Sequence, residues 1–285
     1  MAISAAMVRE LREKSGAAMM DCKKALEASG GDMDAAFDHL RKAGLKTAAK
    51  KAGRETSEGR VQAAVSEDGR TGGMVSVACE TDFVANTPDF SAMMDEYAGV
   101  ARDNDLPTNG DAVEHFGTLG TSDGSAVAEH LKQVIGKLGE NIQLAGAAHM
   151  TNSGGYVGTY IHHNSKVGVL ASVTTSADLS KAEEVLKKLA QHVAAFRPPY
   201  LNREDVPAED VERERQVHRE SDELSKKPEE IREKIIDGKL NKFFSEQCLN
   251  EQGWIVDDKT AVAKAIAAEL GSDAKIEAFE LFVIG

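Results

Sequence analysis

A glycine and valine pattern that recurs after 95 or 96 residues limits the possible folds of this chain more than any other feature. The first copy reads Gly59-x-Val61-x3-Val65 and continues at Gly73-Met-Val-Ser-Val; the second reads Gly155-x-Val157-x3-Ile161 and continues at Gly168-Val-Leu-Ala-Ser-Val. Each copy has the features of a strand pair and is followed by a helical pattern. The repeat therefore predicts an α+β fold whose core consists of two similar subdomains with antiparallel sheets.

The stretch from Met74 to Phe90 joins the first predicted sheet to a helix. Its first residues alternate as in a half-buried strand, with Val75, Val77 and Cys79 on one face. Thr87 and Pro88 then have the features of a helix start. Between them lies the short connection Thr81-Asp82-Phe83-Val84. Connections usually run over the surface, so Phe83 either folds back into the core or is presented to a partner.

The first residues of the chain predict a small helical module. Helical patterns over residues 4–42 are separated by Ser15-Gly16 and by Ser29-Gly30-Gly31, with Ser4 and Asp32 as caps. The few large apolar residues predict a thin core, which suits a module that binds rather than catalyses. Met19 and Met20 are adjacent, so both cannot face inward on a helix, and at least one is expected at the surface.

The remaining elements complete a division of the chain. We expect a three-helix module and linker at 1–54, a first core subdomain at 55–142 and a second at 143–285. A charge-rich segment at about 208–240 predicts an inserted antiparallel helical hairpin, with Pro228 at the start of its second helix. We expect irregular structure at 103–125, a helix opening at Ser180, another at 260–270, and a final strand at 276–284.

Charge and composition exclude several classes of function. The net charge is −13; residues 1–60 carry 12 Lys and Arg against 9 Asp and Glu, so the remaining 225 residues hold −16. An acidic body of this size repels phosphate backbones, so direct nucleic-acid binding is disfavoured. The sequence also shows no run long enough to span a membrane and no secretory signal, which predicts a cytoplasmic protein with no membrane partner.

We find no arrangement of residues that predicts catalysis. Cys22, Cys79 and Cys248 are isolated in apolar patterns and are expected to be buried thiols. His162 and His163 would point to opposite faces of a strand, which makes a shared metal ion difficult. A metal-dependent hydrolase that uses this pair and nearby carboxylates is therefore a weakly supported alternative. We expect no enzyme activity, cofactor or metal.

Two motifs near the N-terminus resemble the signatures of bacterial elongation factor Ts. The first is Leu11-Arg12-Glu13-Lys14-Ser15-Gly16 followed by Met19-Met20-Asp21-Cys22-Lys23-Lys24-Ala25-Leu26, and the second is Thr81-Asp82-Phe83-Val84. The likeness continues through Gly139-Glu140-Asn141-Ile142, His192-Val193-Ala194-Ala195 and Lys242-Phe243. It implies a UBA-like module at the N-terminus and a protruding coiled-coil hairpin. Some members have a further helical module after the last strand, and we expect this chain, ending at Gly285, to lack it.

The resemblance also implies a function, guanine-nucleotide exchange on the GTPase elongation factor Tu. In the family, the aromatic residue of the second motif inserts between helices of the nucleotide domain and disturbs the magnesium site. The residues that the resemblance assigns to the partner contact are Thr81, Asp82, Phe83, Val84, Leu11, Met19, Met20, Lys23, His162, Leu138 and Gly139. The alternative is a scaffold protein that docks on a GTPase without releasing its nucleotide.

Overall fold

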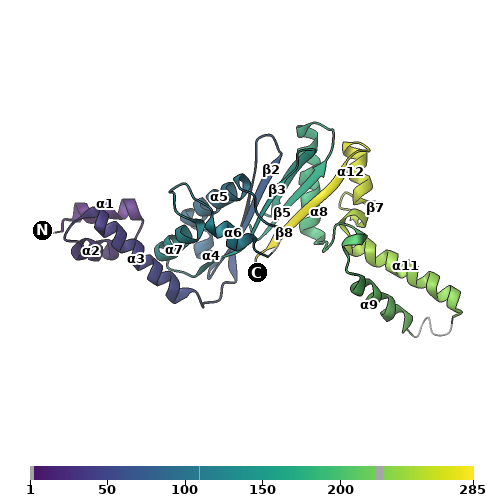
Figure 1. The fold of residues 1–285 in the computed structure, drawn as a ribbon, viewed down its shortest axis with the longest axis horizontal. Helices are drawn as coiled ribbons and strands as arrows, with labels where there is room; N and C mark the ends of the chain where they lie inside the picture. Colours follow the sequence, from purple (N-terminus) through teal and green to yellow (C-terminus); the bar gives the residue numbers. More distant parts are fainter. Residues whose placement is uncertain (1–2, 109, 222–226) are drawn as a thin grey trace.

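Two three-stranded antiparallel sheets form the centre of the molecule (Figure 1). The computed structural model describes residues 3–108, 110–221 and 227–285. The first sheet has the order β1-β2-β3 and consists of β1 (Glu58–Val65), β2 (Thr71–Cys79) and β3 (Ile142–Thr151). The second has the order β4-β5-β8 and consists of β4 (Gly155–Ile161), β5 (Val167–Thr174) and β8 (Lys275–Val283). The predicted α+β class with antiparallel sheets is confirmed.

The two sheets pack face to face, with a helix on each outer side. Val75 and Val77 of β2 belong to the same core cluster as residues of α5 (Pro88–Asp103). Val169 of β5 packs likewise with α8 (Leu179–Phe196). A third cluster lies between the sheets and includes Met74 of β2 and Leu170 of β5. We expected β2 to be half-buried, which is wrong, because the second sheet covers its other face.

The repeat holds in three dimensions, but with a corrected spacing. Gly59 pairs with Ala78 and Gly155 with Thr174, so the two hairpins superimpose at an offset of 96 residues in both strands. The counterpart of Gly168 is therefore Gly72 and not Gly73. A Cβ on Gly72 would lie 2.7 Å from Val157 Cγ1, and one on Gly168 would lie 2.4 Å from Val61 Cγ1. These reciprocal contacts show that glycine lets the two sheets approach each other closely.

The N-terminal module contains the three predicted helices, α1 (Ala5–Ser15), α2 (Met19–Ala28) and α3 (Met33–Lys51). Ser4 Oγ accepts a hydrogen bond from the Met7 N–H, and Asp32 accepts from two amides of α3. Gly16 ends α1 in the left-handed conformation, with φ of 65°, which glycine adopts without strain. The predicted caps are thus confirmed, and the core around Leu11, Cys22 and Leu26 is small.

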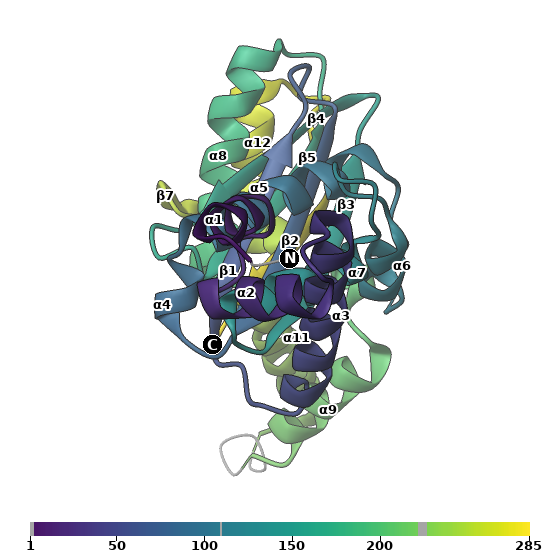
Figure 2. The same cartoon turned by 90° about the vertical axis from the view of Figure 1, so that its left-hand side faces the viewer.

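Helix α3 extends beyond the module and packs on the first subdomain. Its second half runs alongside α7 (Val127–Leu138), as Figures 1 and 2 show from two sides. A Cβ on Gly136 would lie 2.7 Å from Gly44 Cα, so the two helix backbones come close. Ala48 belongs to the core cluster of α5 and β2. Helix α3 therefore contributes to both cores across the expected boundary at residue 54. Strand β3, which begins at the expected boundary of 142, pairs with β2 of the first sheet.

We expect two N-terminal deletions to differ in stability for this reason. Deleting residues 1–40 should leave the core folded, because Leu45 and Ala48 can still pack on α7. Deleting residues 1–54 should lower the unfolding free energy of the remainder by a further 2 to 4 kcal/mol or so, since it removes this apolar contact. Urea unfolding of both chains measures the difference, and equal stability would show that the second half of α3 is dispensable.

The charge-rich segment forms the predicted hairpin at the opposite end of the molecule (Figure 1). It consists of α9 (Ala208–Arg219) and α11 (Glu229–Gln247), and α11 begins directly after Pro228 as predicted. Arg219 lies 3.0 Å from Glu233 and Arg215 lies 3.5 Å from Asp237, so the helices are antiparallel. The predicted tip includes residues 222–226, which lie outside the described residues. Ile236 and Leu240 are buried in a small cluster with Val211 of α9, and the second arm continues past residue 240 to Gln247.

Other elements depart from the sequence predictions. Part of 103–125, expected to be irregular, forms α6 (Ala112–Thr118), because Phe116 is buried and packs edge-on against Tyr97 at 5.9 Å between ring centroids. Helix α8 begins at Leu179 rather than Ser180, since Asp178 caps it by accepting from the Lys181 N–H. Phe196, the last residue of α8, is 53% exposed, although the helical spacing of apolar residues predicts it on the buried face.

The C-terminal part adds short elements. These are η1 (Arg203–Asp205), η2 (Leu249–Glu251), β6 (Gly253–Trp254), β7 (Asp257–Ala261) and α12 (Val262–Leu270). The predicted helix at 260–270 thus begins at Val262 and ends before Gly271, and the predicted final strand is β8.

All three cysteines are buried free thiols, as predicted. Burial raises the pKa of Cys79 and of Cys248 to about 11, so neither thiol is a reactive thiolate at neutral pH.

Candidate partner-binding site

The motif Thr81-Asp82-Phe83-Val84 forms a capped helical turn at the end of β2. Within the predicted short connection, residues 82–85 form the short helix α4 (Asp82–Ala85). Thr81 is its N-cap, and its Oγ1 accepts a hydrogen bond from the Val84 N–H at 3.4 Å. A four-residue helix is too short to be stable alone, so its surroundings must hold it.

Phe83 points away from the protein. Its side chain is 82% exposed, the highest value among the large apolar residues that are exposed in the described structure. Val84 on the same turn is half-buried against the core of the first subdomain, and Ala85 is buried. Asp82, next to the ring, is exposed. The turn is therefore anchored by one side and presents an aromatic ring on the other, which is the feature expected of a partner contact.

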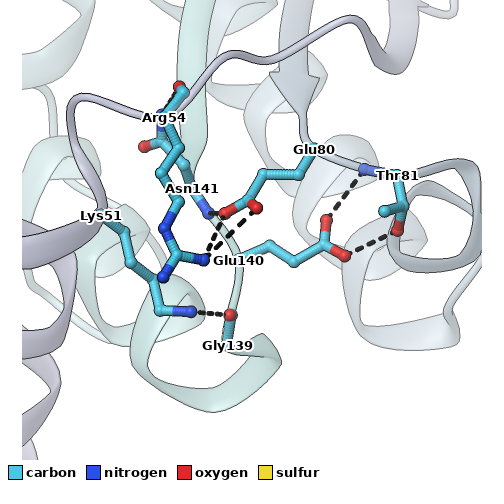
Figure 3. A network of polar contacts seen from close by, with 7 residues as sticks. All are labelled: Lys51, Arg54, Glu80, Thr81, Gly139, Glu140 and Asn141. Atoms are coloured by element: carbon cyan, nitrogen blue, oxygen red, sulfur yellow. Dashed lines mark hydrogen bonds and ion pairs between the residues drawn. The ribbon is translucent and has the colours of Figure 1, made fainter.

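Two carboxylates link the turn to the connection between α7 and β3: Glu80, at the end of β2, and Glu140, in the connection itself (Figure 3). Glu140 accepts hydrogen bonds from the Thr81 N–H at 3.0 Å and from Thr81 Oγ1 at 2.6 Å. Glu80 accepts from the Asn141 N–H at 2.6 Å and lies 3.4 Å from the Arg54 guanidinium. The Asn141 amide, and secondly the positive charge of Arg54, hold the pKa of Glu80 below its ordinary value. Glu80 thus connects the end of β2 with two other segments, the one that contains Arg54 and the one that contains Asn141.

The segment that leaves α3 is part of the same network. Lys51 Nζ donates to the Gly139 carbonyl, and Asn141 Nδ2 donates to the Arg54 carbonyl at 2.7 Å. Gly139 ends α7 with φ of 77°, a conformation that allows the sharp turn into β3. Leu138 is half-buried and Gly139 is exposed. The structure therefore brings Gly139 into the network that surrounds the Thr81 motif (Figure 3), whereas Leu138 packs against the core of the first subdomain.

The sequence reasoning did not find these supporting residues. Glu140 and Asn141 belong to the motif Gly139-Glu140-Asn141-Ile142, which points to a family but not to a contact with Thr81, and Arg54 falls in the predicted linker. A signal was present: a Glu-Asn pair follows a glycine that ends a helix, where backbone groups need partners. The sequence does not show, however, that Thr81 lies beside Glu140, since the two are 59 positions apart.

The residues expected in the N-terminal module divide into exposed and buried ones. Met19 and Met20 are 51% and 60% exposed, so both reach the surface where at least one was expected. Lys23 is exposed and lies 3.8 Å from Glu27. Leu11 is fully buried in the core of the module. In this conformation Leu11 offers no surface to a partner, and it supports the module by packing.

His162 lies in the second subdomain, in the turn after β4. Its Nδ1 is 2.9 Å from the Tyr160 hydroxyl, and its ring centroid is 4.2 Å from that of His163. The expectation that the two rings point to opposite faces of a strand is wrong, because β4 ends at Ile161 and strand alternation does not continue. Among residues 3–108, 110–221 and 227–285, no group of three or more His, Cys, Asp or Glu side chains could hold a metal ion.

In the described parts of the chain, no helix combines the length and apolar character needed to cross a membrane.

The model of the family described as Elongation factor TS matches residues 80–285. An elongation factor Ts of Magnetococcus marinus is 40% identical over 288 residues, covering 100% of this chain and 93% of the relative. One of Nitratidesulfovibrio vulgaris is 42% identical over 293 residues, covering 100% and 96%.

A relative from a third organism agrees with these. An elongation factor Ts of Clostridium botulinum is 39% identical over 287 residues, covering 99% of this chain and 93% of the relative. The relatives are matched over the N-terminal module as well as over the part that the family model covers. The chain therefore belongs to the elongation factor Ts family, a family of translation elongation factors.

Proposed function

We propose that this protein binds elongation factor Tu in its GDP-bound form and promotes exchange of GDP for GTP. The observation that carries the proposal is Phe83, a large apolar ring that is 82% exposed on an anchored turn. An exposed ring of this kind has little reason to be there unless a partner buries it. Family membership supplies the partner class, and the resemblance of Thr81-Asp82-Phe83-Val84 to the family signature supplies the role of the ring.

The proposed mechanism is coupled binding rather than covalent chemistry. A GTPase holds GDP through a phosphate-binding loop, a helix N-terminus and Mg²⁺. Phe83 would insert between helices of the nucleotide domain and stabilise a conformation in which the magnesium site is disturbed. Burying one Phe side chain contributes roughly 1.5–3 kcal/mol, which corresponds to about one to two decades in an equilibrium constant. No bond is made or broken by this protein, so we propose that it is not an enzyme and needs no cofactor.

Further contacts are needed to supply the docking energy. We propose that the exposed Met19 and Met20, with Lys23, form a second contact on the N-terminal module, and that His162 forms one on the second subdomain. We also propose that the module is UBA-like and that α9 and α11 form a coiled-coil arm used for contacts. The net charge of −13 supports a protein partner rather than a nucleic acid, and translation places this function in the cytoplasm.

Release of fluorescent GDP tests the proposal directly. Elongation factor Tu is loaded with the labelled nucleotide, excess unlabelled GDP is added, and the release rate is measured with increasing amounts of this protein. We expect a saturable acceleration. Binding without acceleration would support the scaffold alternative, in which the protein docks on the GTPase and leaves its nucleotide in place.

A further inference from the structure

We propose that Glu140 is a positioning residue that holds α4 in the conformation presenting Phe83. The proposal rests on the exchange function above and adds to it a residue that does not itself contact the nucleotide. Both hydrogen bonds of the Glu140 side chain within the described residues go to Thr81, one from the backbone N–H and one from Oγ1 (Figure 3). Glu140 therefore acts on the turn through its cap.

The contact extends from Glu140 to the first turn of α4. One carboxylate oxygen of Glu140 accepts from the Thr81 N–H at 3.0 Å, and the other accepts from Thr81 Oγ1 at 2.6 Å. The same Oγ1 accepts from the Val84 N–H, which is one of the amides that a helix start leaves without a partner. Hydrogen bonds to a carboxylate are stronger than those between neutral groups. The orientation of Thr81, and with it that of the turn, is thus fixed by Glu140.

The position of Glu140 is itself fixed on both sides. Before it, Gly139 ends α7, and the Gly139 N–H donates to the Ile135 carbonyl at 2.9 Å. After it, Asn141 is buried, and it donates through its N–H to Glu80 and through Nδ2 to the Arg54 carbonyl. Glu140 therefore projects from a rigid turn between α7 and β3. A rigid support matters because a four-residue helix does not hold its own conformation.

A double-mutant cycle on GDP release tests whether Glu140 acts through Phe83. Phe83→Ala, Glu140→Ala and the double variant are compared in the fluorescent-GDP assay. We expect Glu140→Ala to slow release about tenfold, because it removes both hydrogen bonds between the carboxylate and Thr81. In the Phe83→Ala background the same change should matter less than about twofold, because no ring remains to be positioned. Glu140→Gln keeps an acceptor for the Thr81 N–H but loses the charge, so its release rate should lie between those of Glu140→Ala and the parent.

Glu96→Ala is a matched control for these variants. Glu96 on α5 accepts from both the N–H and the Oγ of Ser122, through one oxygen, as Glu140 accepts from the N–H and the Oγ1 of Thr81 through two. Removing the Glu96 carboxylate breaks a comparable contact away from α4, so the rate of GDP release should stay that of the parent. Amide hydrogen exchange gives an independent measurement: Glu140→Ala should accelerate exchange of the Val84 and Ala85 amides, and Glu96→Ala should not.

The outcomes separate the two proposals. Equal slowing by Glu140→Ala in both backgrounds would overturn the positioning role, as would a parental rate in Glu140→Ala itself. Release slower in Glu140→Gln than in Glu140→Ala would contradict it too, because glutamine keeps an acceptor that alanine lacks. A parental rate in Phe83→Ala would refute the function proposed for the ring. Unchanged exchange of the Val84 and Ala85 amides in Glu140→Ala would then refute the structural role of Glu140 as well.

Discussion

Phe83→Ala is expected to slow GDP release stimulated by this protein by about one to two decades and to leave the free protein as stable as the parent. This reduction in rate corresponds to the burial of one aromatic side chain in the complex. It assumes that the ring is buried in the open state of the partner and not in the GDP-bound state. The unchanged stability follows from the 82% exposure of the ring in the free protein. Truncating an exposed side chain usually changes the unfolding free energy by no more than about 0.5 kcal/mol.

Two other phenylalanines provide matched controls. Phe90, seven positions along the chain, is fully buried, so Phe90→Ala should lower the unfolding free energy by about 3–5 kcal/mol. Phe196 is 53% exposed but lies on α8, so Phe196→Ala should leave GDP release unchanged. Thermal unfolding and the release assay on all three variants separate a lost core residue from a lost contact.

Linkage gives this prediction a second measurement. The factor by which the protein weakens GDP binding to its partner must equal the factor by which GDP weakens binding of the protein. Phe83→Ala should reduce both factors together, and titrations with and without GDP can follow them. A Phe83→Ala protein that is strongly destabilised, yet while folded stimulates release as well as the parent, would show that the ring is a structural residue.

Gly73→Ala is expected to destabilise the first subdomain by about 3 kcal/mol or more. Gly73 lies on β2 and faces α5, and a Cβ there would come within 2.0 Å of the Arg102 backbone nitrogen. Backbone cannot move aside as a flexible side chain can, so the helix must shift from the sheet and lose packing along its buried face. Urea unfolding followed by circular dichroism measures the loss.

Gly99→Ala is the control for that substitution. Gly99 lies within α5, and a Cβ there would meet nothing within 4 Å. Alanine is the better helix former by about 0.5–1 kcal/mol, so this variant should be slightly more stable than the parent. Parental stability in Gly73→Ala would mean that α5 and β2 are less closely packed than the structure shows.

The elements predicted correctly depend on neighbours in sequence. The caps at Ser4 and Asp32, the helix stops at Gly16 and Gly271 and the helix start after Pro228 all follow from local hydrogen bonding and allowed dihedral angles. The hairpins of both sheets follow from strand alternation. For these parts of the fold, the physical cause of the structure lies in residues that are close together in the sequence.

The errors arise where distant segments meet. Alternation in β2 suggested one buried face, but the second sheet, from residues beyond 154, covers the other. The repeat was aligned on the wrong glycine, because Gly72 and Gly73 are adjacent and only the strand pairing distinguishes them. In the candidate site, the sequence left open whether Phe83 folds into the core or is exposed to a partner. Its support by Glu140 was not foreseen, because no local pattern joins residues 59 positions apart.

The close crossing of α3 and α7 at Gly44 and Gly136 has a consequence for association with a partner. A module on a flexible tether would lose its freedom of movement each time it bound, and that loss of entropy would weaken the complex. Here the helix that carries the module is already packed on the body, and Lys51 and Arg54 fix its end. Met19 and Met20 are therefore held relative to Phe83 before a partner arrives. The two proposed contact regions would form a preorganised pair, so engaging the first would bring the second close to its target with little further loss of entropy.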